Sequence, residues 1–61
     1  MNFKTYDYVT FEGQAEDTTA QFMHHDYFTG MSTIRIWSAK GRHVGDVVKD
    51  PSEVKLLKKV A

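Results

Sequence analysis

The three histidines are the residues that come closest to forming a metal site. His24 and His25 are adjacent and are followed by Asp26, and His43 lies farther along the chain. Imidazole nitrogens and carboxylate oxygens are ordinary zinc ligands. Adjacent residues of a strand point to opposite faces, so His24 and His25 cannot ligate one ion together unless the strand bulges between them. We therefore expect no metal, and we expect one of these two histidines to be half-buried and the other solvated.

The sequence offers few candidates for other catalytic chemistry. It contains no cysteine, and its serines and threonines lack the glycine-framed elbow that exposes a serine nucleophile. Glu16 and Asp17 form a pair of carboxylates, but they stand in a polar stretch that we expect to be solvated. The sequence has no glycine-rich phosphate-binding loop. We therefore predict a protein that is not an enzyme and that uses no cofactor.

Aromatic side chains are the stronger lead. The chain of 61 residues has four Phe, three Tyr and one Trp, more than a single small core needs. Exposed Trp and Tyr side chains are common energetic anchors of protein interfaces. We predict that the partner is another protein and that it is contacted by Tyr6, Tyr8, Tyr27, Phe28, Arg35 and Trp37. The alternative for Trp37 is a structural role, in which it covers one end of a barrel.

The charges are balanced overall but unevenly placed along the chain. Residues 1–30 carry one lysine against five acidic residues, and residues 31–61 carry seven basic residues against three acidic ones. Aromatic residues beside basic ones suit nucleic acid, so a small DNA- or RNA-binding barrel that uses Arg35, Trp37, Lys40 and Arg42 is an alternative. The zero net charge favours a protein partner, or simple neutralisation of one half by the other.

Alternating apolar and polar residues predict several strands. They cover residues 3–11, 18–25, 31–38 and 42–48, with a polar loop over 12–17 and a turn over 26–30. Val9, Phe11 and Phe22 are the expected core residues of the first two strands, and Tyr6 and Tyr8 point outward. The three residues 39–41, which end in a glycine, fit a type I turn closed by a left-handed residue. The hairpin over residues 31–48 is therefore the element around which we expect the chain to fold.

The last segment begins with a helix-start signal. Asp50 is a candidate N-cap, Pro51 suits the first helical position, and Glu53 is placed as the acid of a capping box. We predict a 3₁₀ turn over residues 51–53 followed by a closing strand, because the edge of a small sheet needs a partner. The alternative is an α+β fold with a short helix over residues 51–59.

Two stretches resemble the SH3-like small β-barrels, which include the Tudor and KOW-type domains. Residues 6–11, Tyr-Asp-Tyr-Val-Thr-Phe, are similar to the opening Gly-Asp-x-Val-x-Phe strand of such domains. Residues 51–57, Pro-Ser-Glu-Val-Lys-Leu-Leu, resemble their last 3₁₀ turn and closing strand. The resemblance implies an all-β fold, with a single five-stranded SH3-like barrel over residues 1–61. It also implies binding without catalysis.

The length and composition lead to further expectations. A chain of 61 residues makes a single domain of marginal stability. The lack of cysteine favours a cytoplasmic protein, of a host or an infected cell, and no apolar run approaches the roughly 20 residues that span a membrane. The size fits a phage or mobile-element protein that modulates a host enzyme. An unpaired edge strand would permit self-association, so we expect a monomer or an edge-paired dimer.

Overall fold

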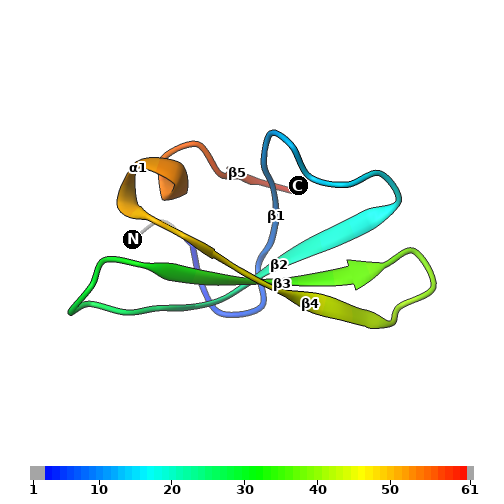
Figure 1. The fold of residues 1–61 in the computed structure, drawn as a ribbon, viewed down its shortest axis with the longest axis horizontal. Helices are drawn as coiled ribbons and strands as arrows, with labels where there is room; N and C mark the ends of the chain where they lie inside the picture. Colours follow the sequence, from blue (N-terminus) through cyan, green and yellow to red (C-terminus); the bar gives the residue numbers. More distant parts are fainter. Residues whose placement is uncertain (1–2, 61) are drawn as a thin grey trace.

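The computed structural model describes residues 3–60 as one antiparallel sheet with a single helical turn (Figure 1). The elements are β1 (Tyr8–Thr10), β2 (Thr18–His25), β3 (Ser32–Ser38), β4 (His43–Lys49), α1 (Pro51–Val54) and β5 (Lys58–Lys59). The five strands lie in the order β4-β3-β2-β1-β5. The all-β class predicted from the sequence is therefore confirmed.

The sheet is strongly curled. In Figure 1, β2, β3 and β4 run side by side along the length of the molecule, while β1 crosses them steeply and leads toward β5 and α1 on one side of the sheet. The two edges of the sheet are β4 and β5. The Lys49 side chain links the β4 edge to the loop after β1 and to α1, because its ammonium lies 4.2 Å from the centre of the Phe11 ring and 3.4 Å from a carboxylate oxygen of Glu53 in α1. A cation over an aromatic face is attracted to it.

The core lies on the concave face of this sheet. Its buried apolar residues are Val9, Ala20, Phe22, Ile34 and Leu57. The strand alternation explains the first four, because every second side chain of a strand points to the same face. Leu57 reaches the cluster from the segment between α1 and β5. The predictions for Val9 and Phe22 are confirmed, and Phe11 packs against the same cluster from a partly buried position.

The first strand is much shorter than predicted. The sequence predicts a strand over residues 3–11, but β1 covers only Tyr8–Thr10. The cause is a turn at residues 4–7. Tyr6 has a φ of 76°, and the Asp7 carboxylate accepts the Lys4 N–H at 2.9 Å. Left-handed backbone of this kind is costly for a residue with a Cβ atom and interrupts a strand.

The turn of the central hairpin forms as predicted. Gly41 has a φ of 80°, and its N–H donates to the carbonyl of Ser38 at 2.9 Å. The Ser38 N–H in turn donates to the carbonyl of Arg42 at 2.8 Å. Glycine adopts this left-handed conformation at no steric cost, which sets the register of β3 against β4.

The predicted capping box at Asp50 is confirmed, with Pro51 in the first turn of the helix. The turn it starts is α-helical where a 3₁₀ turn was predicted, because the Val54 N–H donates to the carbonyl of Asp50, four residues back, at 2.9 Å. The alternative helix over residues 51–59 forms only over Pro51–Val54, and the chain then returns to the sheet as β5. No helix within residues 3–60 has the length and apolar character needed to cross a membrane.

Gly30, at the end of the β2–β3 turn, lies close to the Pro51 side chain of α1. This close approach leads to a stability prediction. Gly30 has a φ of 76°, and a Cβ atom there would lie 2.9 Å from Cγ of Pro51. We expect Gly30→Ala to lower the free energy of unfolding by about 2–3 kcal/mol, since a left-handed non-glycine residue costs roughly 1–2 kcal/mol and crowding adds to it.

The matched control is Gly13→Ala. Gly13 has a similar φ of 86°, but a Cβ atom there would have nothing within 4 Å. Denaturant unfolding of both variants separates backbone strain from crowding. An equal loss of stability in the two variants would contradict the contact between Gly30 and Pro51.

Candidate binding surface

The convex side of the sheet carries three of the six predicted partner-binding residues, Tyr8, Arg35 and Trp37, and we call it the outer face. Its members are Tyr8, Thr19, Gln21, Arg35, Trp37, His43 and Asp46. Strand pairing arranges them in two rows. One row runs from β1 to β4 through the pairs Tyr8–Gln21, Gln21–Arg35 and Arg35–Asp46. The second row runs from β2 to β4 through Thr19, Trp37 and His43.

Trp37 is fixed on the outer face by hydrogen bonds. Its indole N–H donates to the side-chain oxygen of Gln21 at 3.0 Å, and the Gln21 amide nitrogen donates to the carbonyl of Tyr6 at 3.2 Å. The His43 ring lies 5.6 Å away, centre to centre, at a tilt of 52°. The indole is only partly buried and lies on the side of the sheet opposite the core. Its orientation is thus set without the core, which is an arrangement suited to an exposed anchor.

Asp46 contacts two basic side chains of the outer face, Arg35 and His43. Its carboxylate oxygen Oδ1 lies 3.0 Å from Nε2 of His43 and 3.2 Å from Nε of Arg35. The hydrogen bond from His43, followed by those from Arg35, holds the pKa of Asp46 below its ordinary value. Because Asp46 offsets the guanidinium charge, Arg35 is a weaker site for phosphate than the sequence suggests.

Lowering the pH should reduce the free energy of unfolding, because it protonates the Asp46 carboxylate. The pKa of Asp46 is lowered in the folded protein, whereas an unfolded Asp has a pKa of about 3.9. A carboxyl whose folded pKa is depressed stabilises the fold above the unfolded pKa, and this stabilisation is lost as the pH falls through the folded pKa. The difference in unfolding free energy between the wild type and Asp46→Asn should be constant above about pH 5 and shrink below about pH 4.

Denaturant titrations between pH 7 and pH 2 measure this difference. Asp7 and Asp50 also have lowered pKa values, Asp7 first through the Lys4 N–H and Asp50 first through the Ser52 hydroxyl. Both variants keep these two groups, so their effects cancel in the comparison. A difference that stays constant down to pH 2 would show that the contacts of Asp46 do not stabilise the fold.

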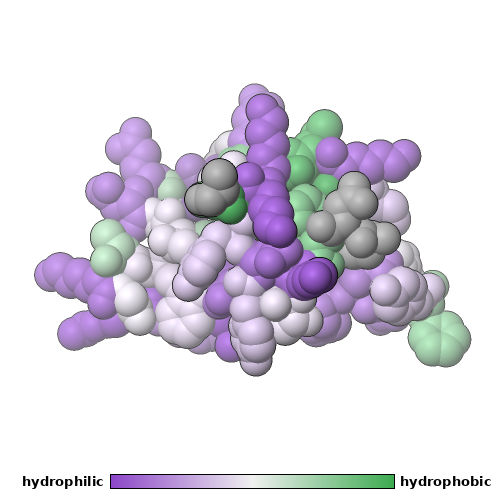
Figure 2. Space-filling model, turned by 180° about the vertical axis from the view of Figure 1, so that it is seen from behind, coloured by the Kyte–Doolittle hydropathy of each residue, from purple (hydrophilic) through white to green (hydrophobic). Residues whose placement is uncertain are grey.

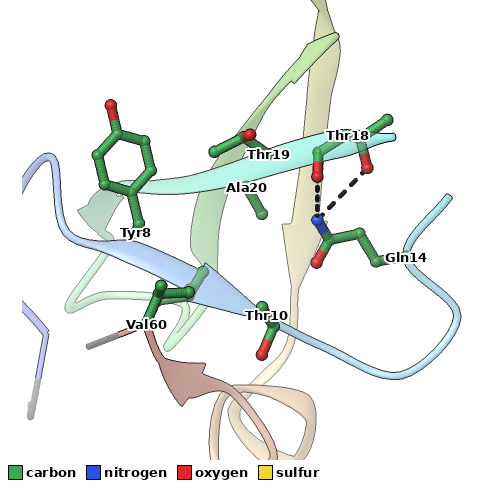
Figure 3. A pocket seen from close by; sticks show the side chains of 8 residues that line it. Tyr8, Thr10, Gln14, Thr18, Thr19, Ala20 and Val60 are labelled. Carbon is green, nitrogen blue, oxygen red and sulfur yellow. Dashed lines mark hydrogen bonds between the residues drawn. The ribbon is translucent and has the colours of Figure 1, made fainter. Parts of the chain in front are cut away.

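Two neighbouring hollows open beside Tyr8 and Thr19, which line both of them. The first, of about 380 Å³, lies where β1 and β2 separate, with Thr10, Gln14, Thr18 and Val60 around it (Figure 3). The second, of about 360 Å³, extends over Gln21 and Trp37 to the β3–β4 turn. In Figure 3 the Gln14 amide reaches across to Thr18, where its nitrogen donates to the Thr18 carbonyl at 3.0 Å. The wall of the first hollow is therefore held in place by hydrogen bonds.

The six residues predicted to contact a partner divide into two groups. Tyr8, Arg35 and Trp37 share the outer face, and Tyr6 is tied to it through its carbonyl and Gln21. Tyr27 and Phe28 lie in the β2–β3 turn, near the other end of a molecule 34 Å long. Figure 2 shows an apolar side chain projecting at that end. The predicted residues therefore belong to two separate surfaces.

The β2–β3 turn exposes two aromatic side chains, Tyr27 and Phe28, to solvent. Phe28 is fully exposed and Tyr27 is 84% exposed. The Asp26 carboxylate accepts the N–H of Phe28 at 2.9 Å and the N–H of Thr29 at 3.4 Å. The Tyr27 ring meets His25 edge-on at 4.7 Å. This turn is a second, smaller candidate surface.

Of the residues of the nucleic-acid alternative, Trp37 lines the second hollow. Lys40 and Arg42 are exposed in the β3–β4 turn, next to the second hollow, whereas Arg35 is engaged by Asp46. The residues that sequence reasoning missed are Thr19, Gln21, Gln14 and Val60. Gln21 could have been suspected, because an indole N–H on a sheet face needs an acceptor on the neighbouring strand; the others depend on strand register.

One of the two adjacent histidines is exposed and the other half-buried, as predicted, but simple alternation from Phe22 would have put His24 on the core side. The register shift between Phe22 and His24 reverses the two faces. His24 is exposed and His25 is half-buried, and Nδ1 of His25 lies 2.8 Å from the hydroxyl of the buried Ser32. Within residues 3–60, no three His, Asp or Glu side chains come together in a way that could hold a metal ion. His25 thus has a structural role, satisfying a hydroxyl in the core.

Comparison with known proteins assigns no family to this chain, so a functional proposal has to be based on the geometry of the outer face. No family model, curated protein or solved structure matches this chain.

Proposed function

We propose that this chain is a small, non-catalytic binding domain that recognises another protein through its outer face. The observation that carries the proposal is the position of Trp37. It lies outside the core, its N–H is held by Gln21 at 3.0 Å, and it borders a hollow shared with Tyr8. Trp and Tyr anchors of fixed orientation supply much of the binding energy in protein interfaces.

The fold supports an SH3-like assignment, which is part of the same proposal. Four strands follow one another across the sheet, and the fifth returns to pair with the first after a helical turn. That order agrees with the resemblance in residues 6–11 and 51–57. A fold of this kind is compatible with many partners, so the outer face has to supply the specificity.

A protein partner fits the charges better than nucleic acid does. The chain has zero net charge, and Asp46 lies in the middle of the outer face beside Arg35. A carboxylate there would repel phosphate. The size of the chain fits a phage or mobile-element protein directed at a host enzyme, and this source is part of the proposal.

Nucleic acid is the second candidate because Lys40 and Arg42 are exposed and form no ion pair within residues 3–60. Amide NMR titration with a mixed-sequence oligonucleotide at low and moderate salt tests it. Shifts over residues 35–42 that fade with salt would favour nucleic acid, since phosphate contacts weaken steeply with salt. The protein-partner proposal expects no shifts at moderate salt.

Self-association is a third possibility, and it concerns the edge strands. Strand β4 is a seven-residue edge whose Val44 and Val48 are exposed, whereas the β5 edge has two residues, both lysines. Edge lysines deter pairing between chains, which leaves β4 as the open edge. Sedimentation over a range of concentrations distinguishes a monomer from a dimer paired along β4.

Affinity capture tests the main proposal. Immobilised wild type, Tyr8→Ala and Tyr27→Ala are incubated with lysate of the source cell. The two substitutions are the same chemical change at exposed tyrosines, one on the outer face and one in the β2–β3 turn. We expect a protein that is retained by wild type and Tyr27→Ala and lost with Tyr8→Ala. Retention by Tyr8→Ala at the wild-type level would overturn the proposal, and loss only with Tyr27→Ala would move the site to the turn.

A further inference from the structure

We propose that the outer face binds an extended segment of the partner, with two apolar side chains at alternate positions that occupy the two hollows. A basic residue of this segment lies on the side of the loop over residues 12–17, and an acidic residue lies on the side of the β3–β4 turn. This inference rests on the proposed function and specifies the chemistry of the partner.

The spacing of the hollows supports alternate positions. The first hollow lies between β1 and β2, and the second lies over β2 and β3. Neighbouring strands are about 4.7–4.9 Å apart, so hollows that lie one strand apart are separated by about 5 Å, and by more where they are also offset along the strands. In an extended chain, side chains two residues apart point the same way and are about 6.7 Å apart. The two lengths are of similar size for a segment that lies across the strands.

The walls of the two hollows combine apolar surface, suited to the side chains of a bound segment, with polar groups suited to its backbone. Val60 provides exposed apolar surface in the first hollow, beside the buried Val9 and Ala20, and the partly buried Trp37 provides it in the second. Three threonines, Thr10, Thr18 and Thr19, supply polar groups around the first hollow (Figure 3). The Thr18 hydroxyl donates to the carbonyl of Ala15 and accepts from the Gln14 amide nitrogen. A binding site with apolar walls and few polar groups is typical of recognition by side-chain insertion.

The unpaired charged residues beside the hollows are segregated, with acidic residues next to the first hollow and basic residues next to the second. Glu16 and Asp17 directly precede Thr18 of the first hollow, and Lys40 and Arg42 flank Gly41 of the second hollow. All four charged side chains belong to exposed residues, and none forms an ion pair within residues 3–60. On the face itself, by contrast, Arg35 is paired with Asp46, and His43 forms a hydrogen bond with the same carboxylate oxygen. Unpaired charges at the rim of an interface select the orientation of a partner.

Selection from a display library of random eight-residue peptides tests the inference. On the wild type we expect enriched peptides that have two apolar residues separated by one position, with a basic residue on one flank and an acidic residue on the other. The variant Glu16→Lys/Asp17→Lys should lose the preference for the basic flank, and Lys40→Glu/Arg42→Glu should lose the preference for the acidic flank. Tyr8→Ala should enrich no such peptide.

The affinity of one enriched peptide supplies the magnitude. Each double reversal should weaken its binding by about fivefold, since it replaces a weak attraction between exposed charges with a repulsion of similar size; fivefold corresponds to about 1 kcal/mol. The reversal Lys55→Glu, at an exposed residue directly after α1 that lines neither hollow, is the control and should leave the affinity unchanged.

The outcomes separate this inference from the proposed function. Enriched peptides that require Tyr8 but show neither alternate apolar residues nor charged flanks would overturn the inference and leave the proposed function standing. An absence of enriched peptides, while the capture experiment still retains a protein through Tyr8, would also overturn only the inference. Failure of the capture experiment would overturn both.

Discussion

Replacing Trp37 with alanine should weaken binding of the captured partner by about 30-fold or more while the domain stays folded. Anchor residues of interfaces cost about 2 kcal/mol or more when truncated, which corresponds to roughly 30-fold in Kd. Trp37 qualifies as an anchor because its ring is already held in place by Gln21 and lies beside His43 at 5.6 Å. Little conformational freedom is then lost when the partner binds.

The fold should tolerate this substitution. Trp37 lies on the outer face, whereas the buried cluster on the other face is made by residues such as Val9, Phe22 and Ile34. The loss is limited to one hydrogen bond, worth about 1 kcal/mol, and to partly buried surface. Titration calorimetry gives the Kd, and denaturant unfolding gives the stability of the same preparation.

The variant Trp37→Phe is the matched control for the hydrogen bond. It keeps an aromatic ring but lacks the N–H that Gln21 accepts, so it should bind with an affinity between those of the wild type and Trp37→Ala. A loss of stability in Trp37→Ala as large as its loss of binding energy would place Trp37 in the structural role that the sequence left open, and it would overturn the anchor assignment.

The sequence predicted correctly those elements that depend only on residues close together in the chain. β2 has the predicted bounds, residues 18–25, because polar and turn-forming segments border it on both sides. The capping residues Asp50 and Glu53 also act as predicted, since a capping box involves only neighbours in sequence. The short β1 was missed because the left-handed Tyr6 has no clear signal in its residue type.

The candidate site was only partly predictable, because it depends on register. Alternation alone put Arg35 and Trp37 on one side of a strand. The contact between Arg35 and Asp46, 11 residues apart, depends on which residues of β3 and β4 face each other. That register includes a shift between Ile36 and Trp37, which period-two reasoning does not foresee. The separation of Tyr27 and Phe28 from Trp37 likewise follows from the length of the strands between them.

Replacing Ile34 with alanine should have the largest effect on stability. Ile34 is fully buried and pairs with Phe22 on one side and with Val47 on the other. A buried Ile→Ala substitution costs about 2–5 kcal/mol, because surrounding atoms only partly fill the cavity. A chain of 61 residues has a total stability of about 3–9 kcal/mol at typical values per residue. The substitution should therefore remove a large part of the total stability at 25 °C.

Two further variants keep this prediction measurable even if Ile34→Ala does not fold. Ile34→Val removes one methylene and should cost about 0.5–1.5 kcal/mol in denaturant unfolding. Val48→Ala, on the neighbouring strand β4 at a position 57% exposed, should change the stability by less than about 0.5 kcal/mol. If Val48→Ala were as costly as Ile34→Val, the apolar core would have to extend to the convex side of the sheet. The outer face could not then be the open surface on which the binding proposal depends.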